Sequence, residues 1–350
     1  MTDPDPDPDP DADPLRPATL LSLSDSVRAS LRQHGTLGPD SARLSAWLRL
    51  ALSQELVVSA PHRIDLHTVR AARLDRLVAD LTRHDLLKGT GGEEQKGEGG
   101  RGTGSCTDEA APPLLRNVAV AAGKLERLWW ARFGAQYFAV DEMRAAELRA
   151  RWGRVVRGRQ AGLRGSGSWF EAETAGGHGD EVGFEPGQWW PDMTCAVVDG
   201  LVWTEQERPG RGRDKVLTIP LLTGKEISTG VDKVRYFREG PLLSDVHPAL
   251  ISQTGKPVRV LRGSGLRSEF APTVGVRNDG LWKIVRYGHA LDEGTRKYRL
   301  ELDLEQVGGQ MPIAELVEIP RSSHLDDWDL YRRVKSSEGG GVVIFATRNG

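Results

Sequence analysis

The sequence predicts an α+β protein in which a helical N-terminal region precedes a β-rich C-terminal domain, folded as a curled sheet or barrel. In the first half, apolar residues recur three and four positions apart, which is the spacing of one helix face. From Gly187 onward the pattern changes to short alternating strands separated by turn residues. The length of 350 residues agrees with two domains, because one domain typically has about 100–200 residues.

The composition excludes several classes of protein. Two cysteines, Cys106 and Cys195, are too few for a disulfide framework or a Cys-rich zinc module. No run approaches the roughly 18 apolar residues of a membrane span, and the N-terminus carries no secretory or mitochondrial signal pattern. We therefore expect a soluble, intracellular protein with no membrane partner.

The net charge of −2 averages two unlike parts of the chain. Residues 1–17 contain an Asp-Pro repeat with six aspartates, and without these the remaining residues carry a charge of +4. Alternating proline prevents a helix or a central strand, and the like charges repel one another. This tail is predicted to be disordered.

The helical region is predicted over residues 18–87. Apolar residues at 44, 47, 48, 51 and 52 form one helix face, and a second helix is predicted over 66–81. Residues 88–113 are rich in Gly, Glu and Lys, which predicts a flexible linker. A long helical segment with bulky aromatic residues on one side follows over 114–160, and a Gly-rich loop over 161–186.

Strand signals follow in the C-terminal domain. Residues 258–261 read as a short strand, and Asn278-Asp279-Gly280 predicts a tight turn that leads into a strand over 281–287. The clearest pattern is the alternation of Tyr298, Leu300, Leu302 and Leu304 with charged residues. It predicts a strand with one buried and one solvated face.

Catalytic motifs are absent from the sequence. There is no Gly-rich loop ending in Gly-Lys-Ser/Thr, no dinucleotide-binding fingerprint and no HExxH pair. A zinc site would need scattered histidines such as His178, His247 and His289. We predict a protein that is not an enzyme and that holds no cofactor and no metal.

Motifs in the C-terminal half follow one another in a recognisable order. They are Gly187-Gln188-Trp189-Trp190 with Gly200-Leu201, then PVRVLRG, Phe270-Ala271-Pro272 and RNDGLWKIVRY, which begins at Arg277. This segment resembles the SET- and RING-associated (SRA, or YDG) domain family, whose signature contains P-V-R-V-x-R, Y-A-P and R-Y-D-G-[LI]-Y-K-V-V. The resemblance covers about residues 187–312. We place the domain at 187–335, before a tail at 336–350. The motif positions are Gly187, Trp190, Gly200, Arg277, Asn278, Asp279 and Gly280.

The resemblance implies an SRA-type, PUA-like β-barrel that binds double-stranded DNA through a basic, crescent-shaped face. Family members recognise 5-methylcytosine, often at hemimethylated CpG sites, by flipping the base into a pocket. Flipping is required because a stacked base presents only its groove edges. The chain departs from the family where Asn278 replaces the Tyr of the family name. Residues 222–240 also lack the family's pocket motifs G-G-Y-E-D-D and Y-T-G-x-G-G.

Candidate DNA- and base-binding residues come from this region and its basic surroundings. Phe237, or Tyr236 one register away, matches a stacking Tyr of the family, and Arg238 then takes the position of a Thr. Asp232 matches the Asp that reads the base in the family by residue type, although not by position. The basic candidates are Lys233, Arg235, Arg262 and Arg267. Taken singly, such arginines also fit the solvent face of a strand and the aromatic residues fit a core, but together they favour nucleic acid.

Two functions from different classes follow. The first is a nuclear DNA-binding protein that recognises 5-methylcytosine by base flipping, acting in chromatin or DNA-methylation pathways with chromatin proteins as further partners. The alternative is a chromatin-associated scaffold whose barrel has lost methyl-base recognition and whose helical half binds proteins. Too few cysteines are present for the zinc sites of a RING or SET enzyme.

Overall fold

The computed structural model describes residues 15–57, 63–83, 113–158 and 183–338. The chain forms two compact units, residues 1–144 and 145–350, which we call unit 1 and unit 2. Several predicted segments lie wholly or largely outside the described residues. These are most of the Asp-Pro tail, most of the linker over 88–113, the larger part of the loop over 161–186, and 339–350 of the predicted tail.

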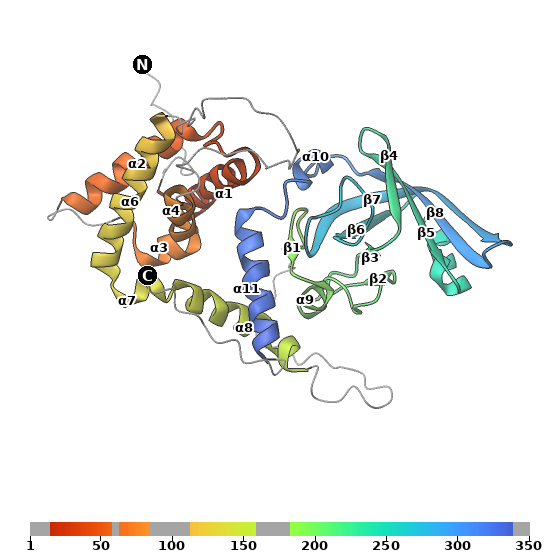
Figure 1. The fold of residues 1–350 in the computed structure, drawn as a ribbon. Coiled ribbons are helices and arrows are strands. Elements are labelled where there is room, and N and C mark those ends of the chain that lie inside the picture. The colour runs from red at the N-terminus through yellow and green to blue at the C-terminus, as the bar shows by residue number, and fades with distance from the viewer. Residues whose placement is uncertain (1–14, 58–62, 84–112, 159–182, 339–350) are drawn as a thin grey trace, which may run out of the picture. The chain divides into compact units, whose positions relative to one another are not determined.

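Unit 1 is a bundle of helices around one apolar core (Figure 1). Its helices are α1 (Pro17–His34), α2 (Ser41–Leu56), α3 (Leu66–Ala71), α4 (Leu74–Thr82), α6 (Pro113–Phe133) and α7 (Ala135–Phe138); α8 (Val140–Gly158) continues into unit 2. Leu20, Leu23, Val27 and Leu31 of α1 are buried at helical spacing. The helix ends at Gly35, whose positive φ of 65° lets its N–H reach the carbonyl of Leu31.

Two predicted helices of this unit are divided in the structure. The helix expected over 66–81 breaks at Arg73, which adopts the left-handed conformation with φ 55°. The long segment expected over 114–160 breaks at Gly134, whose φ is 56°, and again at Ala139. Arg73 and Gly134 cannot continue a right-handed helix, because their φ is positive, whereas Ala139 has a φ of −87°. The chain turns at these points and packs its helices against one another.

In the residues that the structure describes, unit 2 is built on a mixed sheet of eight strands (Figure 1). The strands are β1 (Trp189–Trp190), β2 (Gly210–Arg211), β3 (Leu217–Leu221), β4 (Lys225–Gly230), β5 (Lys233–Gly240), β6 (Pro257–Gly263), β7 (Val276–Asp292) and β8 (Lys297–Gln306). The order is β2-β3-β6-β7-β8-β5-β4, with β1 paired to β7. Among the strand pairs of the described residues, only β3 and β6 run parallel.

The predicted α+β class is confirmed. Helices α9 (Met193–Val198), α10 (Ile313–Leu316) and α11 (Ser322–Glu338), with the 3₁₀ turns η2 (Leu243–Val246) and η3 (Pro248–Gln253), accompany the sheet. Strands β2 and β4 end the sheet, and within the described residues they are not paired with each other. The sheet is therefore open in this part of the chain, and α11 extends three residues beyond the predicted domain end at 335.

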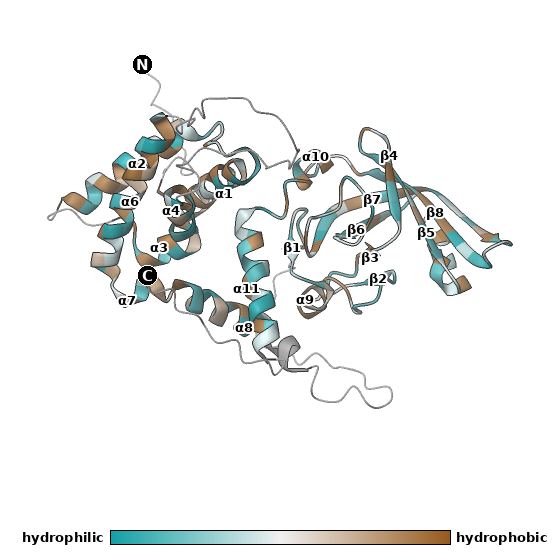
Figure 2. Ribbon diagram, in the orientation of Figure 1, coloured by the Kyte–Doolittle hydropathy of each residue, from teal (hydrophilic) through white to brown (hydrophobic). Residues whose placement is uncertain are grey.

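The alternation predicted for 298–305 is confirmed by burial in β8. Leu300, Leu302 and Leu304 are at most 2% exposed and pack in the core of unit 2 with Val234 and Tyr236 of β5. Hydrophobic and hydrophilic residues alternate along these strands (Figure 2). One face of the β4-β5-β8-β7 sheet is thus core, and the opposite face is open to solvent.

The turn predicted at Asn278-Asp279-Gly280 is wrong, because these residues lie inside β7. Leu261 of β6 pairs with Asn278, and Arg259 pairs with Leu281. Asp279 and Gly280 therefore stand opposite one residue, which is a β-bulge. The side chain of Asn278 accepts a hydrogen bond from the N–H of Gly280, and Gly280 has a φ of 76°. The local chemistry of a turn is present, but it bends a strand instead of reversing the chain.

Candidate nucleic-acid interface

The motif residues that carry the family resemblance form a buried ionic network. Arg262 of β6 donates from Nε and Nη2 to Glu226 of β4 at 2.8–3.2 Å and from Nη1 to Asp279 of β7. Arg277 donates from Nε to Asp279 Oδ1 at 2.6 Å and from Nη2 to Oδ2 at 2.9 Å. All four side chains are 0% exposed. Three strands that are distant in sequence are thereby joined through two arginines and two carboxylates.

The charge in this network is balanced. Burial by itself lowers the pKa of Arg262, but the carboxylates of Glu226 and Asp279 outweigh it and raise that pKa above its ordinary value. The guanidinium also lies 4.7 Å from the ring centroid of Trp282. Arg262 was predicted to contact DNA, and the structure corrects this: its side chain has no exposed surface, and every hydrogen bond that it makes serves the core.

The other motif positions fix the segment that contains β1 and α9. Gly187, with φ 89°, donates its N–H to the carbonyl of Asn278 at 2.8 Å. Trp190 is 2% exposed and donates from Nε1 to Asp199 at 2.7 Å. Gly200, with φ 85°, ends the turn after α9. The residues that identify the motif therefore have structural roles in unit 2.

A second polar cluster fills the inner side of β5. The hydroxyl of Tyr236 donates to Glu207 at 3.1 Å or to the carbonyl of Thr223 at 3.0 Å. Arg238 donates to the carbonyl of Glu207 at 3.0 Å and lies 3.3 Å from His247 Nε2. Burial raises the pKa of Tyr236. Tyr236 is 1% exposed, so the expectation that it could stack on a base is wrong, and Arg238 is turned away from the solvent face.

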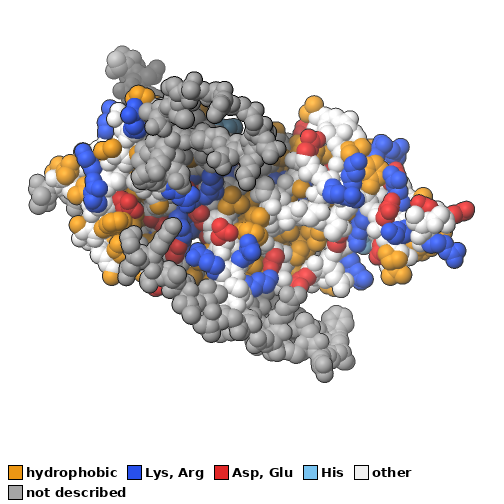
Figure 3. Space-filling model, viewed as in Figure 1, with side chains coloured by type: hydrophobic (Ala, Val, Ile, Leu, Met, Phe, Trp, Pro, Cys, Tyr) orange, Lys and Arg blue, Asp and Glu red, His pale blue; other side chains and the backbone are white. Residues whose placement is uncertain are grey.

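The outer side of the same sheet presents cations in ordered rows. In one row Glu305 of β8 stands between Lys233 of β5 and Lys283 of β7. In the next row Asp303 stands between Arg235 and Arg286. Directly opposite residues share a face of the sheet, so each row contains two cations and one carboxylate. Lys and Arg side chains gather over this end of the molecule (Figure 3).

The contacts within the rows leave positive charge in excess. Asp303 accepts from Arg235 and, at 2.8 Å, from Arg286, and the hydrogen bond from Arg235 contributes most to the lowered pKa of Asp303. Lys233 lies 3.4 Å from Glu305. One carboxylate shared by two cations cannot neutralise both, so each row retains a net charge of about +1.

Phe237 lies next to these rows on the outer face of β5. Lys225 of β4 is its direct neighbour on one side and Glu301 of β8 on the other. The guanidinium of Arg299 lies 4.8 Å from the centroid of the Phe237 ring. We define the cationic face as Lys225, Lys233, Arg235, Phe237, Lys283, Arg286 and Arg299. An aromatic ring among cations is the combination that binds a base together with its phosphates.

Two predicted residues lie at the edge of this face. Asp232 forms the turn between β4 and β5 with φ 55°, and its carbonyl accepts a hydrogen bond from the N–H of Gln306. Arg267 is exposed and pairs with Lys225 through the backbone. The structure thus brings Phe237, Lys233, Arg235 and Arg267 together at one surface, and their role in binding DNA stays a prediction.

Four cations of the face were not among the predicted binding residues, namely Lys225, Lys283, Arg286 and Arg299. Their signal was present in the strand alternation, since Arg299 falls on the solvated side of β8. Within the described ranges no group of three His, Cys, Asp or Glu residues could hold a metal ion. The helices in those ranges are too short or too polar to cross a membrane.

Comparison with known proteins gives matches only among solved structures. No protein-family model matches the chain, and no curated protein matches it. The chain is similar to a modification-dependent TagI restriction endonuclease at 21% identity and a TM-score of 0.30, over 41% of this chain and 55% of that one. It therefore spans about half the length of that endonuclease.

Two further similar structures come from the proteins SUVH5 and SUVH6. One is the SUVH5 SRA domain in complex with methylated CHH DNA, at 17% identity and a TM-score of 0.28, over 37% of this chain and 94% of that one. The other is Arabidopsis thaliana SUVH6 in complex with SAM, at 19% identity and a TM-score of 0.28, over 39% and 28%. Each alignment covers about two fifths of this chain.

Proposed function

We propose that unit 2 binds double-stranded DNA through the cationic face and recognises a modified base there. The observation that carries this proposal is the pair of rows in which one carboxylate lies between two cations. Lys233 and Arg235 stand on β5, and Lys283 and Arg286 stand on β7. Because β8 separates these strands, the two lines of cations are about 9–10 Å apart.

The carboxylates orient the cations without cancelling them. Asp303 holds two guanidiniums in place, which reduces the side-chain entropy that each loses when it meets a phosphate. The surplus charge of each row is then available to the DNA backbone. Contacts of this kind release counterions, so the affinity must fall steeply as salt rises.

The resemblance of residues 187–312 to the SRA family suggests 5-methylcytosine in a hemimethylated CpG site as the modified base. Phe237 is the aromatic residue of the pocket region that reaches the outer face, and we assign it the stacking role that base flipping requires. The role proposed is one of binding. The nuclear location and the action with chromatin proteins stay predictions.

Fluorescence anisotropy with the full chain tests this function. The probes are one duplex in hemimethylated, fully methylated and unmethylated forms, each measured across a range of salt. The Lys233→Gln, Lys283→Gln double variant is expected to lose at least tenfold in affinity and to flatten the slope of log K against log salt by about 2. Lys124→Gln on α6 of unit 1 is the matched control, because it removes an exposed charge outside the face.

Each outcome decides one part of the proposal. Absence of binding at low salt refutes DNA as the ligand. Equal losses in the double variant and in the control refute the cationic face. Equal affinity for methylated and unmethylated duplexes refutes modified-base recognition. A Phe237→Ala variant that keeps the same preference refutes the stacking role assigned to Phe237.

The scaffold alternative is favoured by one observation in unit 1. Trp130 and Phe138 are 41% and 66% exposed, and their ring centroids lie 5.6 Å apart. Exposed aromatic pairs are common anchors of protein interfaces. A Trp130→Ser, Phe138→Ser variant of the full chain that binds DNA normally but loses a copurifying protein would support the scaffold.

A further inference from the structure

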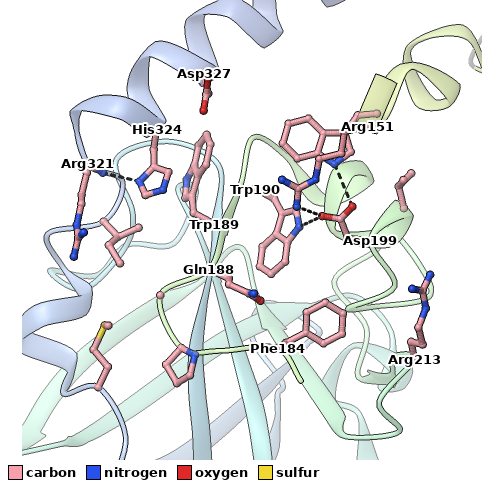
Figure 4. A pocket seen from close by; sticks show the side chains of 16 residues that line it. Arg151, Phe184, Gln188, Trp189, Trp190, Asp199, Arg213, Arg321, His324 and Asp327 are labelled. Carbon is pink, nitrogen blue, oxygen red and sulfur yellow. Dashed lines mark hydrogen bonds and ion pairs between the residues drawn. The ribbon is translucent and has the colours of Figure 1, made fainter. Parts of the chain in front are cut away.

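A cavity of about 880 Å³ lies in unit 2 and shares none of its lining residues with the cationic face. Its walls come from the segment 184–190, the end of α9, the β2–β3 connection, and helices α8 and α11. The volume lies within the roughly 300–1,000 Å³ of sites that bind small molecules. Figure 4 shows the side chains that surround it.

The cavity has aromatic walls. Phe184 and Trp190 lie with their ring centroids 6.3 Å apart, and Trp189 lies 5.4 Å from the ring of His324. Trp189 is fixed because its Nε1 donates to the carbonyl of Val274 at 2.8 Å. Because Trp189 and Trp190 are at most 9% exposed, the half-buried ring of Phe184 is the one that offers a stacking surface to a planar ligand.

The carboxylate of Asp199 is already fully engaged. It accepts from Trp190 Nε1 at 2.7 Å, from Arg151 at 2.6 Å and from Trp152 Nε1 at 3.4 Å. Asp199 therefore fixes two tryptophans and forms an ion pair with Arg151. Neither the carboxylate of Asp199 nor the guanidinium of Arg151 is then available to a ligand.

Two other arginines of the cavity are differently placed. Arg213 and Arg321 form no ion pair with any residue in the described ranges, and they lie on opposite sides of the cavity in Figure 4. The side chain of Arg213 packs over Gly200, and a Cβ at that glycine would lie only 3.1 Å from the Nε atom of Arg213. Unpaired guanidiniums at an aromatic cavity favour a ligand with an anionic group.

Gln188 adds a group that can read the edge of a planar ring. Its side chain is exposed and lies between Phe184 and Trp190 in Figure 4. Within the described residues its amide makes no hydrogen bond, so both the donor and the acceptor are available. An amide of this kind forms paired hydrogen bonds with the edge of a nucleobase.

From these features we propose that the cavity is a second binding site, which takes a nucleoside monophosphate. The base stacks on the ring of Phe184, Gln188 contacts the edge of the base, and Arg213 or Arg321 binds the phosphate. The ligand is either a free nucleotide or a single nucleotide of a DNA strand. This site does not depend on the cationic face.

Tryptophan fluorescence and isothermal titration calorimetry of the full chain test the site. The probes are the four deoxynucleoside monophosphates up to millimolar concentration, the corresponding nucleosides, and inorganic phosphate. Nucleotides are expected to quench fluorescence, because Trp152, Trp189 and Trp190 line the cavity. Nucleosides and phosphate are each expected to bind at least tenfold more weakly. A short single-stranded oligonucleotide that competes with the nucleotide identifies the strand as the source, whereas a lack of competition identifies the free nucleotide.

Variants separate this site from the rest of the molecule. Arg213→Gln and Arg321→Gln are expected to weaken nucleotide binding, at least one of them tenfold or more, while Arg296→Gln in the β7–β8 turn leaves it unchanged. The Lys233→Gln, Lys283→Gln variant is expected to keep full nucleotide binding, so failure of the cationic face leaves this site intact. The proposal is overturned if no nucleotide binds at millimolar concentration, or if both cavity arginine variants bind as the Arg296 control does.

Discussion

Asp279→Asn tests the buried ionic network most directly. The substitution keeps nearly the same side-chain volume but removes the carboxylate that Arg262 and Arg277 share. The network then holds two buried guanidiniums against Glu226 alone, and the new amide nitrogen points a donor at another donor. Removing one partner of a buried ion pair typically costs about 3–5 kcal/mol. For a unit of this size, that corresponds to a fall in Tm of about 6–20 °C.

Thermal unfolding followed by near-UV circular dichroism measures this change. Because the chain has two units, the transition that reports Trp282 of unit 2 is the one expected to move. Asp303→Asn is the matched control, since Asp303 pairs with arginines on the solvent face and exposed pairs contribute about 0–1 kcal/mol. If Asp279→Asn lowers Tm no more than this control does, the network does not stabilise unit 2 and the reasoning fails.

Three further predictions concern neighbouring features. Burial first, and then the charge of Arg238, lower the pKa of His247, against smaller opposing contributions from Glu207 and Asp245. The unfolded chain then binds more protons, so the stability of unit 2 should fall as pH drops from 7 to 5, and His247→Gln should remove this dependence in urea titrations. Gly224→Ala should destabilise unit 2 by about 1–3 kcal/mol in chemical denaturation, because Gly224 has φ 89° and a Cβ would lie 2.3 Å from the Phe237 carbonyl oxygen. Asp80→Asn should lower the stability of unit 1 alone, since Arg28 donates to Asp80 at 2.8 Å with both groups largely buried; an unchanged unit 1 transition would contradict it.

Local patterns in the sequence predicted much of the fold. The burial of Leu300, Leu302 and Leu304 follows from strand alternation, and the core of α1 follows from helical spacing. The breaks at Arg73 and Gly134 could not be predicted in this way, because they depend on how the flanking helices pack. At Asn278-Asp279-Gly280 the same hydrogen bond serves a turn or a bulge, and only the pairing with β6 decides between them.

The candidate site was predicted in part for a similar reason. Alternation over 233–240 already places Val234 and Tyr236 on the side opposite to Phe237, which would have resolved the choice between the two aromatic residues. Arg235 pairs with Asp303 of β8, which is 68 residues away, and Arg262 pairs with Glu226 of β4, which is 36 residues away. Whether such an arginine is buried or faces solvent depends on cross-strand pairing, which no local pattern contains.

The buried network also bears on how such proteins diverge. Because Arg277 and Asp279 are held by the demands of folding, substitutions there are removed whatever the protein binds. Folding does not constrain the residues on the outer face of β4 and β5 in this way, so these positions tolerate substitution. The motif therefore reports the scaffold of unit 2, and ligand preference must be judged from the surface strands.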